Sequence, residues 1–273
     1  MRFSNFRNYH ELVASKERID IWLTNYQEIT EARLLSSLRK LLSDDERARE
    51  TRFHFTDDRL RYLVTRSMVR TVLSRYVPVA PAKWIFSANA YGRPVIANRD
   101  KDATSLRFNI SHTRGLIALA ISRDRDLGVD VEDFRNRHVS LDGANKYFSP
   151  MELAELAAIP AEQRQVRFFE YWTFKESYVK ARGMGFALPL DRFGFHFPHE
   201  HGVKIVVDQE LDIDGNRWSF WQFQPTREHL LSVCAERLGN EGPALTIRKT
   251  IPTIEDEMID MPLLKSTEIL SRY

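Results

Sequence analysis

The chain has 273 residues, of which 43% are hydrophobic and 29% are charged. This size and composition are typical of a globular protein with one large domain or two small ones. The formal net charge is only +2, which argues against the strong basic excess of a nucleic-acid-binding protein. The single cysteine, Cys234, excludes an intrachain disulfide framework and a thiolate-rich zinc site.

The sequence carries no membrane signal. No apolar run approaches the length of a transmembrane helix. Residues 1–5 lack the apolar core of a signal peptide. We therefore expect a cytoplasmic protein that does not enter a membrane.

The first half of the chain predicts a strand, two amphipathic helices and then a run of strands. These elements occupy residues 19–23, 31–42, 57–77 and 84–134. Between the helices, Ser43 and Glu46 have the spacing of a helix N-cap signature. Within the strand-rich block, residues 90–95 predict a turn that presents Arg93.

The second half repeats this order. A helix begins at Ser149-Pro150, and a longer central helix is expected over residues 168–185. Strands then follow at residues 193–197, 203–207, 218–224 and 230–235. We therefore predict an α+β fold with two similar halves, residues 1–125 and 126–238. Residues 239–273 change character, with an acidic cluster at 255–257, and are expected to form an appended tail.

The central helix carries charges on a largely apolar surface. Phe168, Trp172 and Val179 fall near one stripe at helical spacing. Glu176 and Lys180 are one turn apart on the same face. Taken alone, this pair also fits an ordinary surface ion pair.

Residues 128–132, Gly-Val-Asp-Val-Glu, place two carboxylates two positions apart. On a strand, Asp130 and Glu132 project from the same face. Paired carboxylates suit Mg²⁺, which commonly binds substrate phosphates as well. The alternative is a half-exposed strand with polar outer residues. A third carboxylate from another element, such as Glu176, would complete a metal site.

Ser111 and His112 follow a predicted strand and could act as nucleophile and base, or could both bind a phosphate. Ser111 does not lie in a Gly-x-Ser-x-Gly elbow, so phosphate binding is favoured over a serine hydrolase. Three further histidines, His196, His199 and His201, lie in a predicted hairpin. They fit a solvated turn better than a metal site.

Five segments, in this order along the chain, resemble motifs of the large surfactin-type class of 4′-phosphopantetheinyl transferases. They are residues 92–94, 108–113, 128–132, 148–152 and 172–180, the last followed by Gly183 and Gly185. The two most informative match Gly-x-Asp-x-Glu and Trp-x-x-Lys-Glu-x-x-x-Lys. Arg93 replaces the usual lysine, which changes geometry but keeps the charge, and Thr113 replaces serine.

The resemblance implies a pseudo-twofold fold and a defined reaction. Such enzymes transfer 4′-phosphopantetheine from coenzyme A to a serine of an apo acyl or peptidyl carrier protein and release 3′,5′-ADP. It further implies that Asp130, Glu132 and Glu176 hold Mg²⁺. Glu176, Lys180 and Glu132 are the implied catalytic residues, with Glu176 favoured as the base, directly or through a metal-bound water. Glu132 or Glu152 could take the proton instead.

The resemblance also implies which residues bind coenzyme A. They are Arg49, Arg61, Arg93, Pro94, Ser111, His112, Lys175 and Lys180. An acidic carrier would meet basic and apolar groups that follow the metal strand. The candidates are Arg135, Arg137, Lys146, Phe148 and Met151.

Two other functions remain open from the sequence. One is a catalytically silent module that binds a carrier protein or coenzyme A. The other is a Mg²⁺-dependent phosphohydrolase that uses the same carboxylates. The protein is expected to be a monomer without a nucleic-acid partner.

Overall fold

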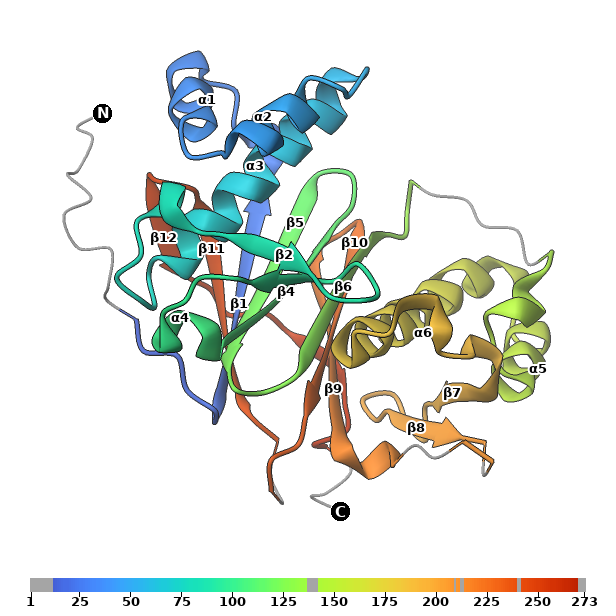
Figure 1. Ribbon diagram of the computed structural model, residues 1–273. Helices are drawn as coiled ribbons and strands as arrows, with labels where there is room; N and C mark the ends of the chain where they lie inside the picture. Colours follow the sequence, from blue (N-terminus) through green and yellow to red (C-terminus); the bar gives the residue numbers. More distant parts are fainter. Residues whose placement is uncertain (1–11, 137–141, 209, 212–213, 240–241, 270–273) are drawn as a thin grey trace.

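The computed structural model describes residues 12–136, 142–208, 210–211, 214–239 and 242–269. It confirms the α+β class, with two main sheets between helices (Figure 1). In spatial order, the first sheet contains β12 (Glu255–Met258), β11 (Ala244–Ile251), β1 (Arg18–Asn25), β5 (Leu116–Arg123) and β4 (Leu106–His112). The second contains β13 (Leu263–Ser266), β9 (Trp218–Thr226), β10 (His229–Glu236) and β6 (Leu127–Asp133).

Two small hairpins, six α-helices and several short 3₁₀ helices complete the described elements. The hairpins are β2 (Phe86–Ala88) with β3 (Pro94–Ile96), and β7 (Phe193–His196) with β8 (Lys204–Val207). The helices are α1 (Ala32–Arg39), α2 (Asp44–Glu50), α3 (Thr56–Leu73), α4 (Lys101–Ser105), α5 (Pro150–Ala158) and α6 (Ala161–Arg182). Among the described helices, none combines the length and the apolarity needed to cross a bilayer.

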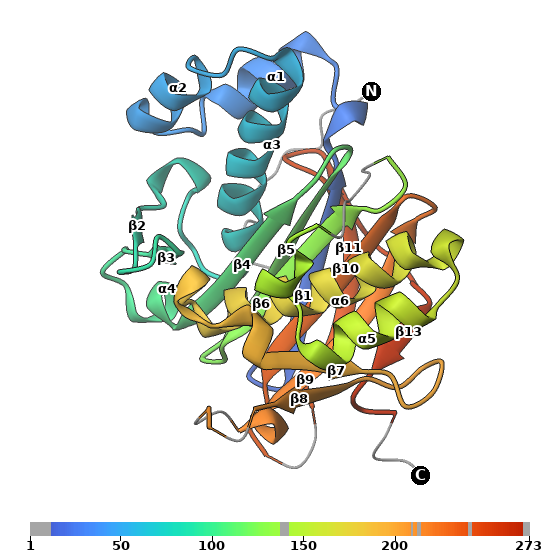
Figure 2. The same cartoon turned by 90° about the vertical axis from the view of Figure 1, so that its right-hand side faces the viewer.

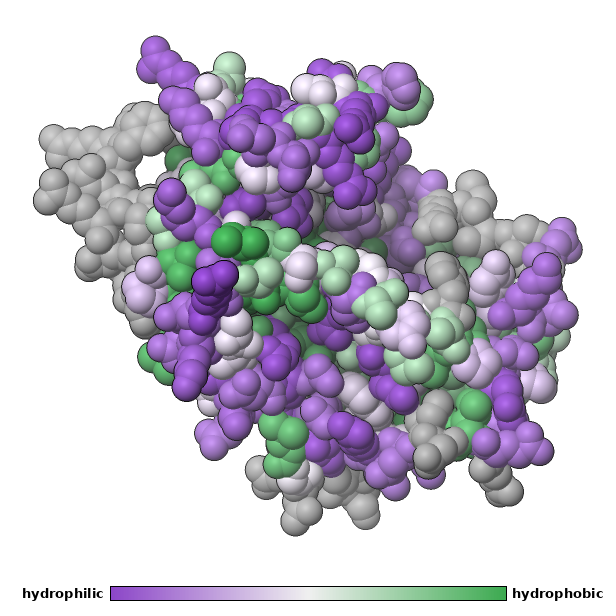
Figure 3. Space-filling model, in the orientation of Figure 1, coloured by the Kyte–Doolittle hydropathy of each residue, from purple (hydrophilic) through white to green (hydrophobic). Residues whose placement is uncertain are grey.

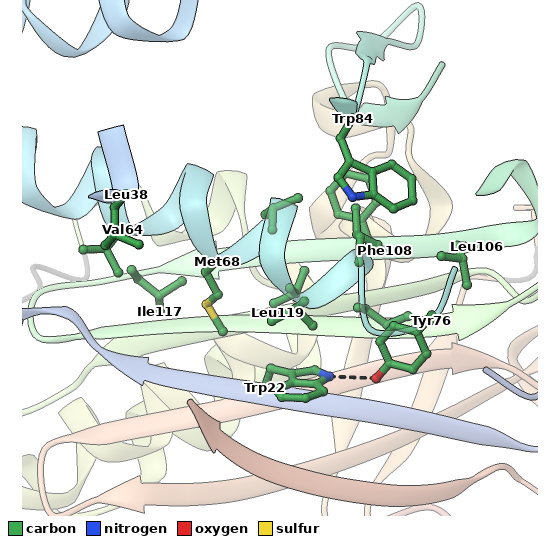
Figure 4. Packing of buried hydrophobic residues seen from close by; sticks show 14 of the residues in the cluster. Trp22, Leu38, Val64, Met68, Tyr76, Trp84, Leu106, Phe108, Ile117 and Leu119 are labelled. Atoms are coloured by element: carbon green, nitrogen blue, oxygen red, sulfur yellow. Dashed lines mark hydrogen bonds between the residues drawn. The ribbon is translucent and has the colours of Figure 1, made fainter. Parts of the chain in front are cut away.

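Each sheet carries one long helix, and the two sheets share a core. Helix α3 packs on the first sheet, where Trp22 donates a hydrogen bond to Tyr76 inside an apolar cluster (Figure 4). Helix α6 packs on the second sheet through buried rings such as Phe174 and Tyr178. A third cluster joins strands of both sheets, as with Ile21 and Val129. Burial of these side chains stabilises the halves together rather than separately.

Two helix starts follow the capping signals in the sequence. Ser43 and Glu46 form a capping box at α2, and Ser149 forms one with Glu152 at α5. Helix α6 begins at Ala161, earlier than the expected residue 168. It ends at Gly183, whose φ of 63° is a left-handed conformation that favours glycine.

The segment after Gly239 is not an appended tail, contrary to the sequence prediction. Its strand β11 pairs in parallel with β1, and β12 extends the same sheet. Its strand β13 pairs with β9 in the second sheet. Residues 244–266 therefore form outer strands of both sheets (Figure 2).

Candidate active site

The two strand motifs meet where the sheets meet. Strand β4, which carries Ser111 and His112, is an edge strand of the first sheet. Strand β6, which carries Asp130 and Glu132, is an edge strand of the second. These strands lie side by side, with α6 packed against β6 (Figures 1 and 2). The fold thus brings three motifs that are distant in sequence to one seam.

Asp130 is the buried centre of this seam. Only 4% of the residue is exposed. Its Oδ1 accepts hydrogen bonds from Lys180 Nζ at 2.6 Å and from Ser111 Oγ at 2.9 Å. Within the described residues, no donor reaches its buried Oδ2. A buried carboxylate oxygen without a partner is costly, and a cation would satisfy it.

Glu132 lies two positions further along β6 and is partly buried. Its Oε1 accepts a hydrogen bond from Trp172 Nε1 at 3.2 Å. From the sequence, Trp172 belonged to the apolar stripe and to the motif over residues 172–180, and no contact with Glu132 was predicted. Trp172 precedes Glu176 by four residues and so lies on the same face of the helix, which is the sequence feature that indicates its closeness to the carboxylates.

Glu176 completes the carboxylate group from α6. Burial, followed by the charges of Asp130 and Glu132, raises the pKa of Glu176 to about 7, although Lys180 opposes the shift. All three carboxylates line one cleft of about 680 Å³.

The donor chemistry of this group fits Mg²⁺. Three carboxylates offer hard oxygen ligands, and the orphaned Asp130 Oδ2 faces no competing donor in the described chain. The three side chains are not arranged as a ligand shell, because no group of three His, Cys, Asp or Glu side chains among the described residues has a geometry that could hold a metal ion. Lys180 Nζ, bound to Asp130, instead neutralises part of the charge.

Cationic side chains also line the cleft, and we call them the cationic wall. They are Arg49 from α2 and Arg61 and Arg66 from α3, of which Arg61 pairs with Asp58 and Arg66 with Glu46. The imidazole of His112, at the end of β4, lines the same cleft. Arg49 lies over the ring of Tyr62, 5.9 Å from its centroid. Desolvation, then the charges of Arg61 and Lys180, lowers the pKa of His112. The sequence did not single out Arg66, although it follows Tyr62 by one helical turn.

Lys175 does not reach the cleft, which contradicts the prediction that it binds coenzyme A. Its side chain is 0% exposed and forms an ion pair with the equally buried Glu152 at 2.9 Å. Lys175 Nζ also donates to the carbonyls of Leu190 and Phe193. Glu152, in turn, accepts from the Phe195 amide. This buried pair joins α5, α6 and β7, and it removes Glu152 as a candidate base.

Arg93 lies beside the cleft, but its guanidinium is engaged elsewhere. It donates to the carbonyls of Ala181 at 3.0 Å and Leu127 at 3.1 Å. It thereby fastens the β2–β3 hairpin to the end of α6, and Asn89 adds a bond to Gly183 O. This geometry fits a structural role better than the expected phosphate contact. Pro94, next to it, does line the cleft.

Ser111 is also committed within the protein. Its hydroxyl donates to Asp130, while Lys180 Nζ donates to it at 2.8 Å. It therefore orders Asp130 and Lys180, while His112 lines the same cleft. The predicted phosphate role of Ser111 stays a prediction.

The expected carrier contacts divide into buried and exposed groups. Phe148 is only 1% exposed and packs against Phe168, so it cannot offer an apolar contact. Its neighbour Tyr147 is 41% exposed and packs edge-on against Trp172. Arg135 and Lys146 are exposed. Residue 137, another candidate, lies outside the described residues.

The molecular surface shows an apolar group in the middle of a mostly hydrophilic face (Figure 3). This group lies over the β2–β3 hairpin, where Tyr91 and Val95 are exposed, beside Ile85.

The histidines expected in a turn do lie in and after β7, in the β7–β8 hairpin. His201 contacts the carbonyl of Leu264 there.

Comparisons with known proteins agree with this geometry. The profile described as "4′-phosphopantetheinyl transferase superfamily" matches residues 126–234, and "4′-phosphopantetheinyl transferase, N-terminal" matches residues 29–124. The 4′-phosphopantetheinyl transferase HetI of Nostoc sp. is 37% identical over 153 residues, which cover 56% of this chain and 64% of HetI.

Two relatives from Bacillus subtilis match over more of their length. The 4′-phosphopantetheinyl transferase ffp is 33% identical over 200 residues, covering 73% of this chain and 84% of ffp. The 4′-phosphopantetheinyl transferase Sfp is 31% identical over 166 residues, covering 61% of this chain and 71% of Sfp. With its two matched halves and its carboxylates at their seam, the chain belongs to the 4′-phosphopantetheinyl transferase superfamily, the enzymes that transfer 4′-phosphopantetheine to carrier proteins.

Proposed function

We propose that this protein transfers 4′-phosphopantetheine from coenzyme A to a serine of an apo acyl or peptidyl carrier protein and releases 3′,5′-ADP. One observation supports this most directly. Asp130, Glu132 and Glu176 line a single cleft together with Lys180 and the cationic wall. A cleft of about 680 Å³ is large enough for a cofactor-sized ligand.

The cationic wall suits the phosphates of coenzyme A. Arg49, Arg61 and Arg66 come from two neighbouring helices and line the same cleft as the carboxylates. Guanidinium groups bind phosphate oxygens through paired N–H donors. We assign Asp130, Glu132 and Glu176 to Mg²⁺, which when bound would neutralise charge on the pyrophosphate.

The chain also supplies groups for the chemical step. The carrier serine oxygen forms a bond to the phosphorus that bears pantetheine, and the bond from that phosphorus to 3′,5′-ADP breaks. We assign acceptance of the serine proton to Glu176, which lies in the cleft with Asp130 and Glu132. Lys180 would stabilise charge on the departing phosphate.

The carrier would dock beside this cleft. Carrier proteins of this kind are acidic, and the exposed Arg135 and Lys146 provide opposite charge. Exposed Tyr147, rather than the buried Phe148, would supply the apolar contact. The cytoplasmic location and the monomeric state remain predictions.

A single assay separates the three candidate functions. The protein is incubated with coenzyme A, Mg²⁺ and an apo carrier protein, and the carrier is weighed by mass spectrometry. Addition of one 4′-phosphopantetheine supports transfer. Bound coenzyme A without addition across a broad carrier panel would favour a silent binding module. Release of phosphate without addition would favour a phosphohydrolase. Asp130→Ala should abolish the addition, whereas His199→Ala should leave it unchanged.

A further inference from the structure

The seam between β4 and β6 poses a hydrogen-bonding problem. Both are edge strands, and an edge strand leaves a row of backbone N–H groups unpaired. Just outside the ends of β6, the Phe134 amide pairs with Glu228 and the Glu236 amide pairs with Asp126 O. Because alternate residues carry the bonds of an antiparallel pair, the even-numbered residues of β6 face β10. The odd-numbered amides therefore point away from β10, toward β4.

Side chains of the β4 segment accept these amides, one by one, at a two-residue spacing. Three acceptors are matched with three donors. The pairs are Asn109 Oδ1 with the Val129 amide at 2.9 Å, Ser111 Oγ with the Val131 amide at 3.3 Å, and Thr113 Oγ1 with the Asp133 amide at 3.3 Å. We call this set the β4–β6 ladder. It joins the two sheets through side chains rather than through a backbone ladder.

The β4–β6 ladder fixes the strand that carries the metal carboxylates. Asp130 and Glu132 alternate with its rungs, so each carboxylate lies between two fastened amides. Helix α6 packs closely against β6 at Gly128, where an added Cβ would lie 2.0 Å from Ser177 O. A slip of β6 along β4 would move both carboxylates relative to Glu176 and to the cationic wall.

We propose that Asn109 and Thr113 are positioning residues that hold Asp130 and Glu132 in register for metal binding. This inference rests on the proposed function. Thr113 shows the role most clearly, because it does not line the cleft and its hydroxyl accepts from the Asp133 amide. Thr113 replaces the serine of the family motif but keeps a hydroxyl, and this hydroxyl accepts a hydrogen bond from the backbone of β6. Partners that orient metal ligands commonly change metal affinity 10- to 100-fold when they are removed.

The first test needs no substrate or metal. Amide hydrogen exchange is measured by NMR on the intact protein. The Val129, Val131 and Asp133 amides should be as protected as the amides that pair with β10. In Thr113→Val, protection of the Asp133 amide should fall, whereas that of the Val129 amide should remain. Exchange of these three amides in the wild type at the rate of an open edge would overturn the inference.

The second test measures the consequence for the metal. Mg²⁺ is titrated into the protein by calorimetry, without coenzyme A. Thr113→Val should weaken Mg²⁺ binding about 10-fold or more, and Thr113→Ser, which restores the hydroxyl, should recover it. Thr250→Val is the control, because it removes a threonine hydroxyl that makes a backbone contact elsewhere, donating to Glu255 O in the outer strands. Its Mg²⁺ affinity should equal that of the wild type.

Two results would contradict the inference in different ways. Unchanged Mg²⁺ affinity in Thr113→Val, or a loss that Thr113→Ser does not recover, would overturn the positioning role and leave the metal site intact. Absence of Mg²⁺ binding in the wild type would overturn the proposed metal site together with this inference. If transfer is then followed, kcat should fall in Thr113→Val at subsaturating Mg²⁺, while KM for coenzyme A stays constant.

Discussion

Lys175→Met should destabilise the protein without acting on coenzyme A directly. Both Lys175 and Glu152 are fully buried. Removing one partner of a buried ion pair costs about 3–5 kcal/mol, because the other charge is left without its counterion. Two carbonyls, of Leu190 and Phe193, would also lose their donor. Glu152 would keep hydrogen bonds from Ser149 and Phe195, so we expect the lower part of this range.

The assay is urea unfolding followed by tryptophan fluorescence for a double-mutant cycle. Glu152→Gln removes the charge of the partner, so Lys175→Met with Glu152→Gln should be less destabilised than the sum of the single changes, by about 1–3 kcal/mol. Lys16→Met is the control, because Lys16 forms an exposed ion pair with Asp124 at 3.8 Å, and such pairs contribute about 0–1 kcal/mol. A cost for Lys175→Met near that of Lys16→Met would refute the reasoning. So would loss of coenzyme A binding at unchanged stability.

Three further outcomes follow from the structure. Burial raises the pKa of Glu46, but Arg66, the Ser43 amide and Arg70 outweigh burial and lower the pKa below its ordinary 4.5. At neutral pH the free energy of unfolding should therefore be larger for the wild type than for Glu46→Gln. This difference should disappear as the pH falls through the lowered pKa of Glu46. Gly128→Ala should unfold at lower temperature than Gly143→Ala. The Gly128 Cβ would lie 2.0 Å from Ser177 O in α6, whereas the Gly143 Cβ meets no atom and costs only the strain of its left-handed φ of 74°; equal melting temperatures would contradict this. Trp172→Phe removes the donor to Glu132 but keeps an aromatic ring, so Mg²⁺ affinity measured by calorimetry should fall while the melting temperature changes little.

Several parts of the site could be predicted from the sequence because they depend on local periodicity. The two-residue period of a strand places Asp130 and Glu132 on one face, and the structure does so. The one-turn spacing of Glu176 and Lys180 brought both into the cleft. The capping signals at Ser43 and Ser149 likewise act within a few residues.

The errors have different physical origins. Lys175 precedes Lys180 by five residues, which rotates it by about 140° around a helix of 3.6 residues per turn. That rotation was sufficient to show that the two lysines cannot both face the cleft, although both were expected to bind coenzyme A. The burial of Glu152, the partner of Lys175, depends on how α5 packs against α6, and no local sequence pattern predicts that packing.

The outer strands could not be predicted from local signals. Strand β11 pairs with β1 across more than 200 residues of sequence, and such pairing depends on what the rest of the fold leaves open. The β4–β6 ladder has the same character. The sequence predicted a phosphate role for Ser111 and His112 and gave Asn109 and Thr113 no separate role, because the amides that Asn109, Ser111 and Thr113 accept belong to another strand.

The central claim is that carboxylates from β6 and α6 form one metal site. The most direct measurement is a Mg²⁺ titration by calorimetry of the wild type and of Asp130→Asn, Glu132→Gln and Glu176→Gln, each without coenzyme A. We predict one site in the wild type and a large loss of affinity in each of the three variants. Wild-type affinity in any one of them would contradict the claim for that residue, and wild-type affinity in all three would refute the site.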